Sequence, residues 1–375
     1  MQRRRFVQSI AAAASLALLL AAALLTPTPP VRAAHAAAPS WNQPAAAHFL
    51  DARELWWQAW PRAQKDHGTV CISCHTVVPY AMVRPALARS LGDPALTPPE
   101  QTLLASVEKR VTYWSEMTPF YLDAKYGPGK TAESRATEAV LNAVILASYD
   151  AAQGRLGPVT RTAFDHAWDL QETSGPLAGA WKWQQFHLGP WESSESGYQG
   201  AALLYLEALN LPSYSEEPAT QPHLAALRDY LRRNYAAQPL VNQIYILWAS
   251  AKDPTLLTHA DRRSLLIALH ASRQSDGGFR LASLDPRDRV DHTPQPSASD
   301  GYATGLVALA LEAIHTRRED PTLRGALHWL SHHQQPDGSW SAASLNKQRD
   351  PASDPALFMT DAATAYAALA LEHRP

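Results

Sequence analysis

The chain has 375 residues, a formal net charge of −2 and 46% hydrophobic residues. Its charge is nearly balanced and forms no basic stripe, so we do not expect a nucleic-acid partner. Only two cysteines are present. A disulfide framework therefore cannot hold the chain together, and its stability must come from a packed hydrophobic core.

The N-terminal segment has the three-part layout of an export signal. Arginines at positions 3–5 precede an apolar run rich in Ala and Leu, and small residues follow up to Ala36. This pattern predicts a signal peptide over residues 1–36 and an exported mature protein, periplasmic or otherwise extracytoplasmic. The alternative is an uncleaved anchor, and we expect membrane association only if the segment is retained.

The stretch VCISCHT contains both cysteines, Cys71 and Cys74, followed directly by His75. It resembles the attachment motif of c-type cytochromes, in which two thiols add to the haem vinyl groups and the histidine binds the iron. The resemblance implies one covalent haem c held by Cys71 and Cys74, with His75 as the proximal iron ligand. A disulfide switch, a zinc site and a plain structural disulfide are the alternatives.

Methionine is the usual second iron ligand in electron-transfer cytochromes. Met117 follows a predicted helix beyond the motif, and it is our candidate for the distal ligand. Met82, His67, His187 and an open coordination position are the alternatives.

Residues 76–131 are too long for an ordinary connection between two helices, and we expect an insertion there. Thr97 and Glu100 have the spacing of a capping box and predict a helix over 98–114. Prolines are expected to keep the remainder irregular, namely Pro79, Pro85, Pro94, Pro119 and Pro128. With the helix that precedes the motif, the insertion gives a predicted c-type haem-binding segment over 46–131.

A repeat runs through the remaining chain, 132–375. LRGALHWLSHHQQPDGSW at 323–340 and LLIALHASRQSDGGF at 265–279 share a helical stretch, a glutamine, Asp-Gly and an aromatic residue. In a weaker copy, Gln171 and Gly175 precede an aromatic cluster. An apolar, Ala-rich helix follows each copy and is expected to be the inner, buried partner. Inner helices are expected at 136–152, 194–210, 239–251, 297–314 and 359–373.

The copy that contains Trp329, Gln334, Gly338 and Trp340 resembles the QW motif of squalene and oxidosqualene cyclases. That superfamily also includes the protein prenyltransferases and forms α/α toroids. The resemblance implies an all-α fold, an α/α toroid of about five helix-pair repeats around a central cavity, with the haem-binding loop and helix inserted near the N-terminus. It also implies that the glutamine hydrogen-bonds helix ends and that the aromatic ring stacks on the next repeat.

Residues 53–70 can be placed on the same template, with Gln64, Asp66 and Gly68 at the turn. The toroid then begins near residue 46, and the two cysteines lie on a loop at one rim.

The catalytic residues of the two toroid enzyme families are missing. The acidic residues Asp285, Asp288 and Asp291 do not match the Asp-x-Asp-Asp motif of the cyclases, and we expect them to pair with nearby arginines, Arg287 and Arg289. No cysteine remains for a prenyltransferase zinc site once the haem motif is assigned.

Aromatic residues are concentrated in 180–198, with Glu192, Glu195 and His187 among them. We expect them either to line the mouth of a cavity or to pack between repeats. Two carboxylates in a cavity could serve as acid and base.

Together these patterns predict an exported monohaem c-type cytochrome on a cyclase-like toroid. The first hypothesis is electron transfer coupled to a hydrophobic, isoprenoid or quinone-like molecule, with that molecule or a redox protein as the partner. One alternative is a haem- or carboxylate-dependent enzyme that acts on a ligand in the cavity. The other is a repeat scaffold that binds a protein partner.

Overall fold

The computed structural model describes residues 41–93 and 95–373 as one compact unit. The predicted signal peptide, 1–36, lies outside the described residues. Six helices form the inner layer of this unit: α3 (Val77–Leu91), α6 (Lys130–Ala152), α8 (Ser196–Leu209), α11 (Leu240–Ala249), α14 (Gly301–Ala313) and α16 (Asp354–Glu372). Six others lie outside them: α2 (Gln43–Ala59), α4 (Pro98–Thr112), α7 (Pro158–Asp169), α10 (Gln221–Asn234), α12 (His259–Ser272) and α15 (Pro321–His332).

Short elements complete the described part of the chain. Strands β1 (Gln64–Lys65) and β2 (Thr69–Val70) pair in an antiparallel hairpin. One-turn helices are α5 (Asp123–Tyr126), α9 (Pro212–Ser215) and α13 (Leu281–Leu284).

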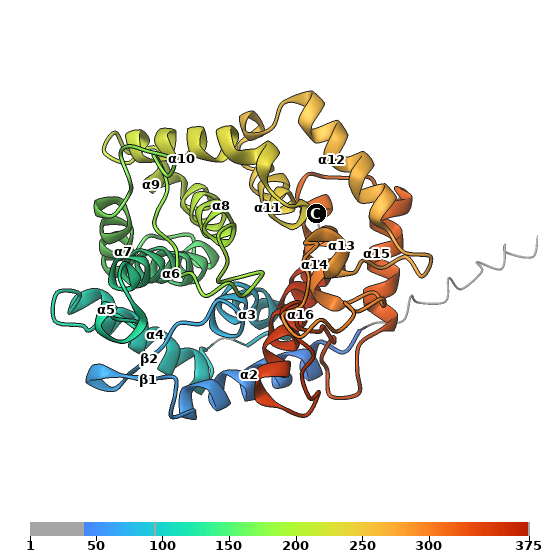
Figure 1. Cartoon of the computed structure of the whole chain (residues 1–375), viewed down its shortest axis with the longest axis horizontal. Coiled ribbons are helices and arrows are strands. Elements are labelled where there is room, and N and C mark those ends of the chain that lie inside the picture. Colours follow the sequence, from blue (N-terminus) through green and yellow to red (C-terminus); the bar gives the residue numbers. More distant parts are fainter. Residues whose placement is uncertain (1–40, 94, 374–375) are drawn as a thin grey trace, which may run out of the picture. The chain divides into compact units, whose positions relative to one another are not determined.

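The inner helices form a closed ring. Each packs against the next in chain order, and α16 contacts both α14 and α3, which closes the circle (Figure 1). The predicted all-α toroid is therefore confirmed, with six helix pairs in the described residues where the sequence led us to expect about five. None of the described helices is both long and apolar enough to cross a membrane.

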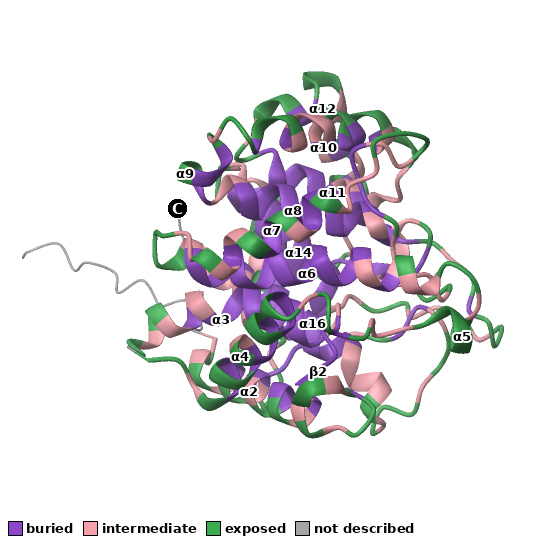
Figure 2. Cartoon of the chain, turned by 90° about the vertical axis from the view of Figure 1, so that its left-hand side faces the viewer, coloured by how far each residue is buried: buried purple, intermediate pink, exposed green. Residues whose placement is uncertain are grey.

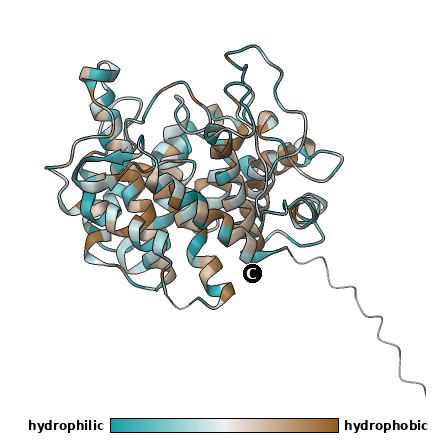
Figure 3. Ribbon diagram, turned by 90° about the horizontal axis from the view of Figure 1, so that it is seen from below, coloured by the Kyte–Doolittle hydropathy of each residue, from teal (hydrophilic) through white to brown (hydrophobic). Residues whose placement is uncertain are grey.

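The two layers differ in burial as the sequence pattern predicts. All of α14 is buried, whereas α10 and α12 expose one side (Figure 2). Figure 3 shows hydrophobic stretches within the packed helices. Small residues allow the closest inner contact, since a Cβ at Gly305 would lie 2.6 Å from the backbone nitrogen of Ala367 in α16. The side chain of Asp300 caps α14, because it accepts a hydrogen bond from the Ala303 amide.

The expected irregular insertion after residue 76 is wrong in its first part. Residues 77–91 form the inner helix α3, and α4 follows with the predicted Thr97–Glu100 capping box. Pro79 lies in the first turn of α3, where a missing backbone donor costs little. Pro85 lies inside the helix, but the apolar residues around it are buried between α16 and α6. Burial of that side of the ring outweighs the cost of about 3 kcal/mol for an interior proline.

The QW-like turn has the predicted structural role. The Gln334 amide nitrogen donates to the Asn42 carbonyl at 3.0 Å, and its carbonyl oxygen accepts from the Asn42 amide at 2.7 Å, which joins α15 to the start of α2. Gly338 has φ +93°, and a Cβ there would lie 2.2 Å from the Ala45 carbonyl oxygen. Trp340 is buried, and its indole donates to the Leu330 carbonyl at 2.8 Å.

The other copies of the repeat show which residues take the places of Gln334 and Gly338. Gln171 joins its turn to α10 by donating to the His223 carbonyl at 3.1 Å. Gly179, with φ +94°, takes the place of Gly338, so the expected equivalence of Gly175 is wrong. The placement of Gln64 and Gly68 is also wrong. They belong to the β1–β2 hairpin, and the Gln64 side chain donates to the Gln58 carbonyl in the last turn of α2.

Candidate functional site: a pocket where the inner helices begin

A pocket lies at the rim where the inner helices begin. Segments just before or within the first turns of α3, α6, α8 and α16 line it. The opposite ends of the inner helices surround a second, more polar cavity.

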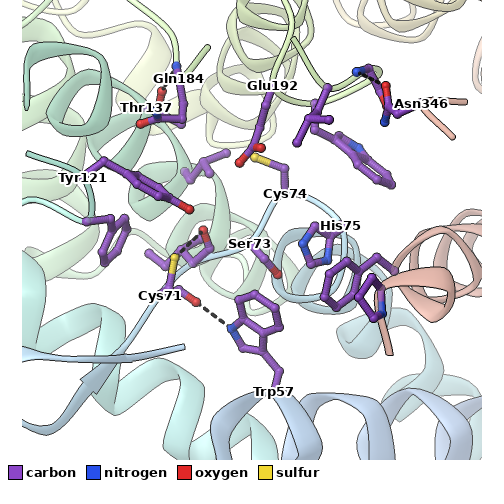
Figure 4. A pocket seen from close by; sticks show the side chains of 18 of the residues that line it. Trp57, Cys71, Ser73, Cys74, His75, Tyr121, Thr137, Gln184, Glu192 and Asn346 are labelled. Carbon is purple, nitrogen blue, oxygen red and sulfur yellow. Dashed lines mark hydrogen bonds between the residues drawn. The ribbon is translucent and has the colours of Figure 1, made fainter. Parts of the chain in front are cut away.

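Cys71, Cys74 and His75 all line this pocket (Figure 4). They lie in the loop between β2 and α3. The Trp57 indole fixes this loop by donating to the Cys71 carbonyl at 2.7 Å, and the Ser73 hydroxyl accepts from the Val77 amide at 3.1 Å. The structure therefore brings together the three residues that the motif singled out.

Both cysteines are free thiols in the structure. Burial raises the pKa of Cys71 to about 12 and raises the pKa of Cys74 further. A disulfide switch normally depends on a cysteine whose pKa is lowered, so these surroundings do not favour that alternative. Within the described residues, no cluster of three or more His, Cys, Asp or Glu side chains is arranged to hold a bare metal ion.

The His75 ring is held between aromatic side chains. It stacks on Phe358 of α16 with ring centroids 4.0 Å apart, and Trp57 packs against it edge-on at 5.1 Å. Burial, reinforced by the charge of Arg53, lowers the pKa of His75 to about 3. The imidazole is therefore neutral near pH 7, which is the form that binds a metal.

A buried chain of hydrogen bonds sets the tautomer of His75. The Thr76 hydroxyl donates to Asp361 at 2.7 Å, so its oxygen is left to accept from Nδ1 of His75 at 2.9 Å. Asp361 is in turn bonded by Arg53 at 2.6 Å. Burial raises the pKa of Asp361, and Arg53 opposes that rise. With the proton on Nδ1, the lone pair of His75 is on Nε2, for which we find no partner in the described part of the chain.

Met117 does not line the pocket. It is buried behind it, and its sulfur lies 4.0 Å from Nη1 of Arg110. Met82 lines the second cavity instead, and His67 and His187 are exposed or partly exposed outside the pocket. The pocket contains another methionine, Met359 of α16.

The opposite wall of the pocket is polar. Burial raises the pKa of Glu192 to about 7, and the charge of Lys130 opposes the rise. Glu195, its expected acid–base partner, does not line the pocket and instead bonds Ser194 at 2.7 Å. Asp285 pairs with Arg287 at 2.7 Å, as expected, whereas Arg289 bonds backbone carbonyls.

The aromatic residues of 180–198 divide between the two expected roles. Trp191 lines the pocket. Trp181 and Tyr198 pack between repeats, where they donate to the carbonyls of Ala167 and Leu231 at 2.6 Å each.

Sequence reasoning missed Thr76, Asp361, Met359 and Gln184 as residues of this site or its support. Asp361 had a weak signal, because it lies where the inner helices of the repeat carry an acidic or hydroxyl residue. The proximity of Asp361 to His75 arises only when α16 closes the ring against α3.

One comparison with known protein families agrees with this architecture. Residues 300–373 match the squalene-hopene cyclase C-terminal domain. The match covers α14 to α16, including the QW-like turn, and the chain is similar to that family there. A search of curated proteins gives no match. Among solved structures, a polysaccharide lyase aligns over 89% of this chain and 90% of its own, with 13% identity and a TM-score of 0.38.

Proposed function

We propose that this protein is an exported monohaem c-type cytochrome, in which the rim pocket of the toroid holds one haem c. Cys71 and Cys74 form the covalent attachments, and Nε2 of His75 binds the iron. The haem would supply one-electron redox chemistry. The partner is a redox protein or a small hydrophobic molecule held beside the haem.

One observation carries the proposal. The same pocket is lined by two thiols and by a neutral imidazole whose Nε2 is available. These two thiols belong to the only cysteines in the sequence. The Thr76–Asp361–Arg53 chain supports His75 in the way that outer hydrogen bonds orient metal-binding histidines. The aromatic walls would exclude water from one side of a porphyrin.

The pocket also offers a group for an acidic cofactor. Arg349 lines it, as does Asn346, whose side-chain amide is already bonded to the backbone of Gly189. No ion pair of Arg349 is found among the described residues, so its guanidinium is free to pair with a carboxylate such as a haem propionate.

Coexpression with a haem-attachment system tests the proposal. We expect a denatured sample to keep its colour and to have the mass of polypeptide plus haem, because thioether bonds survive denaturation. The single variants Cys71→Ser and Cys74→Ser should each retain at most one bond, and the double variant should lose the colour. A colourless wild-type protein from a host that matures other cytochromes would contradict the proposal.

Export is tested separately by cell fractionation. Full-length protein should reach the periplasm, and a variant that lacks residues 1–36 should stay in the cytoplasm without haem. The same fractions show whether the mature protein is associated with the membrane.

A second candidate function is acid–base catalysis in the same pocket. Glu192 favours it, because a carboxyl group with a pKa of about 7 can exchange protons near neutral pH. The two functions are separable: Glu192→Gln should leave haem attachment unchanged, and it should abolish a turnover that depends on the carboxyl group.

A further inference from the structure

The pocket wall formed by α6 and the segment before α8 contains buried polar atoms that lack hydrogen-bond partners. Gln184 is only 4% exposed, yet neither atom of its side-chain amide has a hydrogen bond. Glu138 is fully buried; its Oε1 accepts from Arg110 at 2.5 Å, whereas its Oε2 has no hydrogen-bond partner. Both residues line the pocket. Buried polar groups are nearly always paired in folded proteins, so two such residues in one wall indicate that a ligand or water completes them.

This wall lies away from His75. In Figure 4, Gln184, Thr137 and Tyr121 are on one side of the two thiols, whereas His75 and Trp57 are on the other. The Thr137 hydroxyl holds the wall in place by accepting from the backbone N–H of Gln184 at 2.8 Å. The apolar side chains of Leu141 and Leu188 line the same pocket.

The unpaired atoms define the group that would satisfy them. The Gln184 side chain offers one donor group and one acceptor, and Oε2 of Glu138 offers an acceptor. A hydroxyl group can accept from the amide and donate to one of the two oxygens. An ether or ketone could only accept, which would leave the acceptors of the wall unpaired.

Electrostatics limits the charge of the ligand. Arg110 already bonds Glu138 and Asp66, and Nη1 of Arg135 forms a longer ion pair, at 4.0 Å, with the Oε2 of Glu138 that lacks a hydrogen bond. These cations are partly neutralised, and Glu192 becomes negative above pH 7. A carboxylate or phosphate placed against this wall would face carboxyl groups, so a neutral headgroup is favoured.

We propose that the wall around Gln184 and Glu138 is a subsite for the hydroxyl group of a neutral, largely apolar alcohol. The inference deepens the proposed function, and its location beside the haem rests on that function. The hydroxyl group occupies the side of the pocket away from His75, and the apolar part of the ligand contacts Leu141 and Leu188. No covalent step is involved.

Isothermal titration of the haem-bearing protein with three matched probes tests the subsite. We expect n-octanol to bind more tightly than its methyl ether, and octanoate to bind most weakly. The loss of one hydrogen bond to a buried group corresponds to roughly 1 kcal/mol, or about fivefold in affinity. Equal affinity for the alcohol and the ether, or tighter binding of octanoate, would overturn the proposal.

A variant tests the residue itself. Gln184→Leu should remove the preference for the alcohol over the ether, whereas Gln335→Leu, on the exposed turn after α15, should keep it. Because the Gln184 side chain lacks internal hydrogen bonds, the leucine variant should melt at the same temperature as wild type or higher. A markedly lower melting temperature would show that the side-chain amide of Gln184 has a partner within the protein, which would contradict its assignment to a ligand subsite.

The two proposals fail in different ways. A colourless protein that still prefers the alcohol contradicts the haem and keeps the subsite. A coloured protein without that preference keeps the haem and contradicts the subsite. If both hold, n-octanol should also shift the haem absorption, because the subsite lies next to the two thiols.

Discussion

Glu54 of α2 is the most informative residue for a test of the fold's electrostatics. It is fully buried, and it has no arginine or lysine partner among the described residues. Its Oε1 accepts from Gln58 at 2.9 Å, and its Oε2 has no partner. Burial, with smaller contributions from the nearby Asp361 and Asp51 charges, raises the pKa of Glu54 from 4.5 to about 8. The carboxyl group is therefore neutral in the folded protein at pH 7.

The pH dependence follows from the direction of this shift. Below pH 4.5 the carboxyl group is protonated in both the folded and unfolded states, so it does not lower the free energy of unfolding. Between 4.5 and 8 only the unfolded state releases the proton, so the free energy of unfolding falls as pH rises. At 1.36 kcal/mol per pKa unit, the loss is roughly 1 kcal/mol at pH 5, about 3 kcal/mol at pH 7, and about 5 kcal/mol above pH 9.

Glu54→Gln removes this titration and keeps the acceptor for Gln58. We expect its stability relative to wild type to increase by roughly 2 kcal/mol between pH 5 and pH 7. Urea denaturation followed by far-ultraviolet circular dichroism measures the difference at each pH. Glu108→Gln, on the exposed side of α4, is the control and should show no such trend. If the difference between Glu54→Gln and wild type is the same at both pH values, Glu54 is ionised in the folded state and the reasoning is wrong.

Three further predictions follow from the turn, the histidine and the methionines. Gly338→Ala should destabilise the protein by about 2 kcal/mol or more in urea denaturation, because the new Cβ would clash with the backbone of Ala45. Gly175→Ala is the control: at φ +74° with open space around it, this substitution should cost about 1 kcal/mol. Thr76→Val should raise the reduction potential of the haem, because Nδ1 of His75 loses its hydrogen-bond acceptor. Thr76→Ser keeps the acceptor and should retain the wild-type potential. Equal potentials for the valine and serine variants would refute the tautomer assignment. Met117→Ala should leave the absorption spectrum unchanged because Met117 does not line the pocket; a change to high spin would instead support Met117 as the distal ligand.

The sequence predicted the architecture of this protein in two steps: its periodicity indicated paired helices, and its resemblance to the QW motif implied the toroid. Ala-rich helices with little charge can be stable only when other helices cover them, so the repeat indicated an inner and an outer layer. Gln334, Gly338 and Trp340 indicated a turn after the outer helix, because part of their bonding is local: the Gln334 side chain donates to the Gly338 carbonyl and the Trp340 indole to the Leu330 carbonyl. The residues that this turn meets, Asn42 and Ala45, could not be read from it. The group Cys71, Cys74 and His75 was likewise readable, since a single short loop contains it.

Only the tertiary structure decided what surrounds that loop. Proline content suggested an irregular segment at 77–91, yet closure of the ring between α16 and α6 makes it a helix. The same closure brings Asp361 to Thr76 across 285 positions of sequence, and it brings Phe358 against His75. Contacts between such distant residues depend on how many helices complete the circle. That number is set by the packing of all the inner helices together, and no single segment of the sequence encodes it.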